Sequence, residues 1–204
     1  MSIVTLIESN GINDRDLVTR IKDKFLRFEG SINPPKQVPA TNLFLKGTSD
    51  FINDIRITSV LWEKGKITIY PLYDSEDVVS FQFSGCIMAK FKYYNQYYVA
   101  HVHVTKDEED TRKQWIDFIK NSLWVTEITM FKPNEGVYAY EIWGVITSNG
   151  DCYSIGFNCL GTRVIVKKHV SYGNSLSDYQ ELFSADYETW DNFWSRPYAS
   201  NCRI

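Results

Sequence analysis

The sequence predicts an α+β fold, in which an antiparallel β-sheet or β-sandwich core carries flanking helices. From about residue 54 to residue 170, runs of β-branched and aromatic residues alternate with short polar turns, which is typical of strands. Apolar side chains recur at helical spacing near the start, the middle and the end of the chain. The chain has 204 residues, 44% of them hydrophobic, so a single domain over 1–204 can form a core without disulfides or metals.

Residues 1–50 are predicted to hold one helix and an extended linker. Across residues 13–28 the apolar side chains lie four and three positions apart and Gly30 follows, as at the end of an amphipathic helix. Three prolines within residues 31–40 disfavour regular structure there and indicate a linker. We expect this N-terminal segment to pack on a β-rich core that spans residues 54–170.

The β-rich core is predicted to contain one surface helix and to be followed by a helical C-terminal segment. A charged stretch with apolar side chains in helical register predicts a helix over residues 107–122. The turn at residues 148–151 joins two strands as a hairpin. Residues 177–195 are expected to be helical, with an aromatic cluster that either docks on the sheet or binds a protein. The expected strands are residues 55–62, 66–73, 78–83, 86–94, 97–104, 125–131, 137–147, 152–158 and 162–169.

Composition and charge argue against several function classes. The chain has 22 Lys and Arg against 25 Asp and Glu, a net charge of −3, with no basic run that would indicate a nucleic-acid surface. No apolar stretch approaches the ~20 residues of a membrane span. Residues 1–10 lack the pattern of a cleaved signal, so we expect a soluble protein, secreted as an effector only by a route that needs no such signal. Four cysteines without a CxxC pair predict reduced thiols in a reducing compartment.

Three residues that can carry chemistry stand close together: Cys86, at the start of one predicted strand, and His101 and His103 on the next. A thiol becomes a strong nucleophile when a neighbour lowers its pKa or accepts its proton, and histidine is the usual neighbour. If residues 95–96 form a two-residue loop, Cys86 faces Thr105, both histidines share the Cys86 face, and His103 is its diagonal neighbour. His101 comes opposite Cys86 only with a longer loop or a bulge. Local geometry thus favours His103.

The residues around Cys86 and His101 resemble a known family. The Phe-Ser-Gly-Cys run at residues 83–86 and the Tyr-Val-Ala-His run at residues 98–101 are similar to the Ser-Gly-Cys motif and downstream histidine of bacterial glutamine deamidases. These are the cytotoxic necrotizing factor catalytic domains, related single-domain toxins and the chemoreceptor deamidases. The similarity covers roughly residues 78–105.

The resemblance implies a role for each of three residues. Cys86 would be the nucleophile, His101 its base and Ser80, six positions before the cysteine, an orienting hydroxyl. The choice of His101 follows the family spacing, whereas the simplest hairpin register favours His103. Ile87 departs from the pattern, because many relatives carry threonine or another small polar residue there.

The same resemblance implies a Cys–His hydrolase that converts a glutamine side chain of a protein substrate to glutamate through a thioester, without cofactor or metal. Attack of an amine in place of water would give transglutaminase activity. A bacterial toxin or virulence effector delivered into another cell would suit this chemistry.

Three other interpretations stay open, one of which is a protein that keeps this fold but has lost the activity. Cys86, His101 and His103 could share a zinc or iron ion, since positions i and i+2 of a strand lie on one face. The protein could also be a non-catalytic interaction module, immunity- or adaptor-like, with a buried and unreactive Cys86.

Overall fold

The computed structural model of the protein describes residues 1–9, 15–26, 35–73, 76–104, 109–157 and 164–169. Within these ranges the chain forms three helices, α1 (Ile3–Ser9), α2 (Arg15–Leu26) and α3 (Glu109–Asn121). The strands are β1 (Lys36–Gln37), β2 (Leu43–Leu45), β3 (Gly47–Ile52), β4 (Ile55–Val60), β5 (Ile67–Leu72), β6 (Asp77–Ser80), β7 (Ile87–Tyr93), β8 (Gln96–Val102), β9 (Val125–Phe131), β10 (Glu141–Ile146), β11 (Cys152–Phe157) and β12 (Val164–His169). They form two mixed sheets, with the order β1-β2-β5-β8-β7-β9 in the first and β12-β11-β10-β6-β4-β3 in the second.

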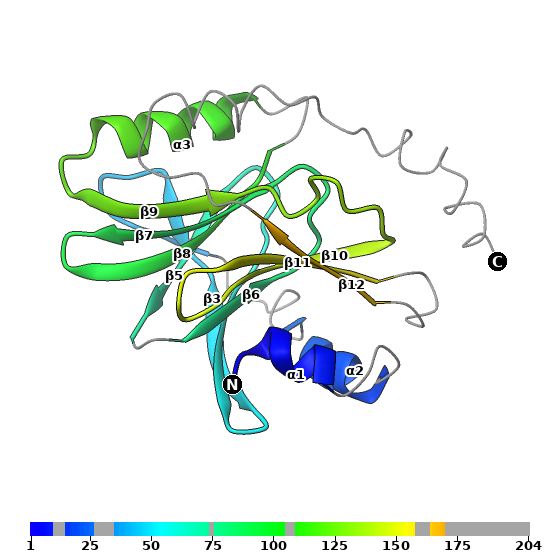
Figure 1. Ribbon diagram of the computed structural model, residues 1–204. Coiled ribbons are helices and arrows are strands. Elements are labelled where there is room, and N and C mark those ends of the chain that lie inside the picture. The colour runs from blue at the N-terminus through cyan, green and yellow to red at the C-terminus, as the bar shows by residue number, and fades with distance from the viewer. Residues whose placement is uncertain (10–14, 27–34, 74–75, 105–108, 158–163, 170–204) are drawn as a thin grey trace.

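The two sheets stack face to face, with helices on both outer faces (Figure 1). α3 covers the first sheet, where Trp115 is fully buried in one apolar cluster. α1 and α2 cover the second sheet, where Phe25 belongs to a cluster that contains Trp143. A third cluster, which contains Cys86 and Met88, lies between the sheets. This arrangement confirms the predicted α+β fold, a β-sandwich core with flanking helices.

The chain passes from the first sheet to the second at Gly47, a corner that sequence analysis did not predict. β2 pairs with β5, whereas β3, which starts after Lys46, pairs with β4. A Cβ atom on Gly47 would lie 2.4 Å from Tyr70 Cγ and 2.5 Å from the Ser59 carbonyl oxygen, so only glycine lets the chain pass this closely. β1, β2 and β3 thus arise in a segment where sequence analysis expected mainly a linker, and β1 lies inside its proline-rich part.

The other elements follow the predicted order with shifted ends. α2 and α3 confirm the two predicted helices, and the hairpin between β10 and β11 is present. α1 was not predicted. The strand expected over residues 78–83 ends at Ser80, and the one expected over residues 137–147 begins only at Glu141. The segment 177–195 lies outside the described residues. None of the described helices is long and apolar enough to cross a membrane.

Asp77 joins α1 to the second sheet. Its side chain, 3% exposed, accepts hydrogen bonds from the backbone N–H of Ile3 at 2.6 Å and of Ser148 at 2.8 Å. We expect Asp77→Ala to lower the free energy of unfolding by about 3 kcal/mol, because both donors lose a charged acceptor. The control is Asp151→Ala, which breaks an exposed ion pair with Lys168 and should cost much less. Equal losses of the two variants in urea unfolding would contradict this role of Asp77.

Candidate active site

The turn of the β7–β8 hairpin lies one residue earlier than predicted. The ladder pairs Tyr93 with Gln96, so residues 94–95 form the turn in place of residues 95–96. Tyr94 takes a φ of 52°, a conformation that turn rules assign to glycine or asparagine. The predicted opposition of Cys86 and Thr105 is therefore wrong. The loop still has an even length, which keeps Cys86 and both histidines on one common face.

Cys86 and the two histidines lie at the same end of these neighbouring strands. The ladder ends at the pair Ile87–Val102, so Cys86 directly precedes β7 and His103 directly follows β8. Continued by one pair, this register puts His103 opposite Cys86, whereas the predicted register made His103 the diagonal neighbour. His101 pairs with Met88 and is thus the diagonal neighbour of Cys86, at roughly 7 Å between Cβ atoms. Cys86, 2% exposed, belongs with Met88 to the cluster between the sheets. The hairpin therefore places the thiol and the His101 imidazole on one buried face.

Ser80 contacts His101 across the gap between the sheets. Ser80 ends β6 in the second sheet, His101 lies in β8 of the first, and Ser80 Oγ is 2.9 Å from His101 Nδ1. The Ser80 hydroxyl donates its single proton to the Val60 carbonyl oxygen at 2.6 Å, so it accepts a hydrogen bond from His101 Nδ1–H. A neutral imidazole with its proton on Nδ1 presents a lone pair at Nε2. The serine thereby sets the tautomer in which Nε2 can act as a base.

Burial keeps His101 neutral. Its side chain is 0% exposed, and desolvation, with a smaller effect of nearby His103, lowers its pKa from 6.5 to about 3. The Nε2 atom is buried and has no hydrogen-bond partner among the described residues. Native proteins contain few buried polar atoms without a partner, so each one calls for a structural or catalytic reason.

His103 is held in the opposite tautomer. Its Nδ1 accepts a hydrogen bond from the Gly65 backbone N–H at 3.0 Å, so a neutral His103 carries its proton on Nε2. Trp62 packs edge-on against the ring, with the centroids 5.4 Å apart. The Gly65 N–H thus occupies the lone pair of His103 Nδ1, and the proton occupies Nε2, so this tautomer is not arranged to accept a proton from Cys86. This is opposite to the preference that the simple hairpin register gave.

A second serine–histidine pair lies in the second sheet. The Ser154 hydroxyl donates to the Pro133 carbonyl oxygen, and Ser154 Oγ is 2.7 Å from His169 Nε2. Cys152 pairs with His169 across the β11–β12 ladder, but burial raises the pKa of the Cys152 thiol to about 12. A thiol that stays protonated is a poor nucleophile, so Cys152 is not a candidate nucleophile although this set resembles the first one in composition.

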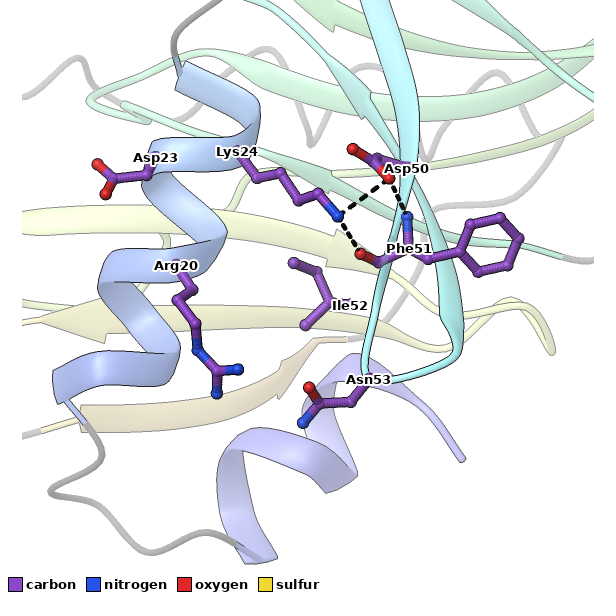
Figure 2. Close-up of a pocket in the computed structure, with 7 residues that line it drawn as sticks. All are labelled: Arg20, Asp23, Lys24, Asp50, Phe51, Ile52 and Asn53. Atoms are coloured by element: carbon purple, nitrogen blue, oxygen red, sulfur yellow. Dashed lines mark hydrogen bonds and ion pairs between the residues drawn. The ribbon is translucent and has the colours of Figure 1, made fainter.

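Three surface pockets lined by described residues include none of Cys86, His101 and Ser80 in their lining. One lies between α2 and the β3–β4 hairpin, where Lys24 reaches across to the Asp50 carboxylate at 3.0 Å and the Phe51 carbonyl oxygen at 2.5 Å (Figure 2). Arg20 and Asn53 line the same space. The lining of this pocket has cations and carboxylates but neither a thiol nor an imidazole.

No three His, Cys, Asp or Glu side chains of the described residues are close enough together to hold a metal ion. The interpretation in which Cys86 and the two histidines share a metal thus receives no support from this part of the chain. Comparison with protein-family models, curated proteins and solved structures finds no match. Function is therefore inferred from the chemistry of the site.

Proposed function

We propose that the protein is a Cys–His hydrolase that converts a glutamine side chain of a protein substrate to glutamate through a thioester at Cys86. One observation carries this proposal: the hydrogen-bond chain from His101 through Ser80 to the Val60 carbonyl oxygen, which leaves Nε2 of a neutral imidazole without a hydrogen-bond partner among the described residues, Cys86 Sγ included. A nucleophile, a base and a third group that orients the base form the general pattern of covalent catalysis.

The proposed reaction has two stages. Cys86 Sγ attacks the carboxamide carbon while its proton passes to His101 Nε2, and His101 then protonates the departing ammonia. Water next attacks the thioester and gives its proton to Nε2, from which the Cys86 sulfur regains it as glutamate forms. The backbone N–H groups of residues 85–86 are the candidate donors to the oxyanion. Ser80 accepts from Nδ1–H throughout, so that all proton transfers use Nε2.

The molecule that attacks the thioester decides the product. Water yields deamidation, whereas an amine that reaches the thioester first yields transglutamination with the same two residues. A bacterial toxin or effector delivered into another cell is the biological setting that fits this activity best.

We expect Cys86→Ser to abolish glutamine conversion while the fold is retained. Wild type and variant are incubated with a cell lysate, and glutamine-to-glutamate conversion is mapped by mass spectrometry of the digested proteins. The control is Cys152→Ser, because Cys152 is buried to the same degree, 1% exposed against 2% for Cys86. Conversion should be lost only in Cys86→Ser, with thermal unfolding of that variant close to wild type. Sites that persist in Cys86→Ser would contradict the proposal.

A non-catalytic interaction module is the second candidate, and an exposed apolar tip favours it. Tyr94, Leu123 and Trp124 are 56%, 90% and 54% exposed. Tyr94 stacks on Trp124 with the ring centroids 4.9 Å apart, and the two turns that carry them meet at one end of the molecule (Figure 1). Rigid exposed aromatics of this kind often mark protein-binding surfaces. If this candidate is correct, wild type produces no converted glutamine in the lysate experiment.

A further inference from the structure

The ring of Phe83 lies flat on the His101 imidazole. The two ring centroids are 4.3 Å apart and the planes are inclined by only 8°. Both side chains are buried, Phe83 being 3% and His101 0% exposed. Phe83 lies three positions before Cys86, on the segment that connects β6 of one sheet with β7 of the other.

A left-handed backbone conformation at Gln82 places the Phe83 ring beside His101. Phe81 points to the outer face of the second sheet, where its ring packs against Trp143 with the centroids 4.9 Å apart. In a regular strand Phe83 would follow Phe81 to that same face. Gln82 interrupts the alternation with a φ of 63°, and Phe83 belongs instead to the cluster between the sheets. A left-handed conformation at a residue other than glycine costs free energy and persists only where the surroundings hold it.

Gly144 leaves room for this ring. A Cβ atom at Gly144 would lie 2.7 Å from Met88 Sδ and from Pro133 Cγ and 3.0 Å from Phe83 Cε2. Met88 is the cross-strand partner of His101, and Ser80 is the cross-strand partner of Gly144. The absence of a side chain at residue 144 therefore permits the position of Phe83 beside the imidazole.

We propose that Phe83 is a positioning residue of the site: it fixes the plane of the His101 imidazole and thereby aligns the segment that carries Cys86 with Nε2. This inference rests on the proposed function. The hydrogen bond from Nδ1–H to Ser80 points Nδ1 toward the serine and Nε2 away from it. This bond alone would let the ring plane tilt about the hydrogen-bond direction. The stacked phenyl ring removes the tilt. Since a misplacement of ~1 Å can cost ~100-fold in rate, loss of the stack should impair the Cys86–His101 pair.

The test compares iodoacetamide labelling of Cys86 at pH 6 in wild type, Phe83→Leu and Phe81→Leu, each with and without His101→Ala. Labelling is followed by peptide mass spectrometry, and Cys152 in the same sample reports any general opening of the core. Phe81→Leu is the matched control, because it removes an equally buried ring from the same segment on the other side of the sheet.

We expect Phe83→Leu to slow labelling of Cys86 by about tenfold and to have no further effect when His101 is already alanine. Phe81→Leu should leave the rate unchanged, although both variants lower the stability. Gly144→Ala should reproduce the slow labelling and replaces Phe83→Leu if that variant does not fold.

Three results would overturn the inference. If Phe83→Leu labels at the rate of Phe81→Leu while His101→Ala still slows wild type, Phe83 is only a packing residue and the proposed function stands. If Phe83→Leu labels faster than wild type without faster labelling of Cys152, the ring covers the thiol and does not position it. If wild type and His101→Ala label equally fast, the proposed function fails, and this inference fails with it.

Discussion

Ser80→Ala should lower glutamine conversion on the order of a hundredfold, the largest loss we expect from a residue that does not touch the substrate. Without the serine oxygen, nothing holds the proton of His101 on Nδ1. The imidazole can then shift its proton to Nε2, the tautomer that cannot accept from Cys86. The substitution also leaves the Val60 carbonyl oxygen and the Nδ1–H buried without this partner, which costs about 1–3 kcal/mol of stability.

Ser154→Ala separates the effect on activity from the effect on stability. Ser154 is 0% exposed like Ser80 and likewise links a histidine to a backbone carbonyl oxygen, at His169 and Pro133. The two variants should lose similar stability in urea unfolding, but only Ser80→Ala should lose conversion. An equal loss of conversion in both would mean that Ser80 acts through stability and not through the His101 tautomer.

The second large effect that we expect is on stability: the free energy of unfolding should fall steeply as the pH falls from 6.5 to 4. Burial lowers the pKa of His101 to about 3 and that of His169 to about 4, whereas the ordinary value is 6.5. In this range the unfolded chain binds protons that the folded chain does not, so the free energy of unfolding falls as the pH falls. Each histidine should contribute about 1.4 kcal/mol per pH unit to the slope of the unfolding free energy against pH in this range. Above pH 6.5 this contribution to the slope disappears, because the unfolded chain no longer binds the extra proton.

The pH dependence is measured by urea unfolding from pH 7 to pH 4 in wild type, His101→Gln and His169→Gln. In each variant the slope of the unfolding free energy against pH should be smaller by the contribution of one histidine, because the glutamine amide does not titrate. A slope that stays at the wild-type value in His101→Gln would mean that His101 is not held neutral in the folded protein.

The depressed pKa has a consequence for catalysis as well. A His101 that stays neutral in the folded protein can accept a proton throughout the mildly acidic range, so activity lost on acidification should follow unfolding and not protonation of His101.

The sequence predicted the parts of the site that lie close together along the chain. The resemblance around Cys86 implied roles for Ser80 and His101, and the structure brings these two side chains into contact. The even hairpin loop put the cysteine and both histidines on one face. The predicted turn of the β7–β8 hairpin was wrong by one residue. Tyr94 takes a left-handed conformation, which is not expected of a tyrosine from sequence. The choice between His101 and His103 followed from the resemblance alone, since local geometry pointed the other way.

The remaining parts depend on contacts between distant segments, and no local pattern marks them. Val60 holds the Ser80 hydroxyl because β4 and β6 lie side by side in the second sheet. Phe83 belongs to the motif, but sequence analysis assigned it no role. Regular alternation along a strand would send its ring to the opposite face. The unexpected φ at Gln82 reverses it. β2 and β3 were not predicted, because the corner at Gly47 becomes evident only from the pairing of β2 with β5 and of β3 with β4.

The most direct test of the central claim, that His101 activates Cys86, is the pH dependence of iodoacetamide labelling at Cys86 in wild type, His101→Ala and His103→Ala. Cys152 is the internal reference, because it is similarly buried and its thiol pKa is raised to about 12. We predict that below pH 7 wild type and His103→Ala label Cys86 at least about tenfold faster than His101→Ala does, while Cys152 stays unlabelled. Labelling of Cys86 that follows an ordinary thiol titration, identical in all three proteins, would contradict the account and leave the interaction module as the better explanation.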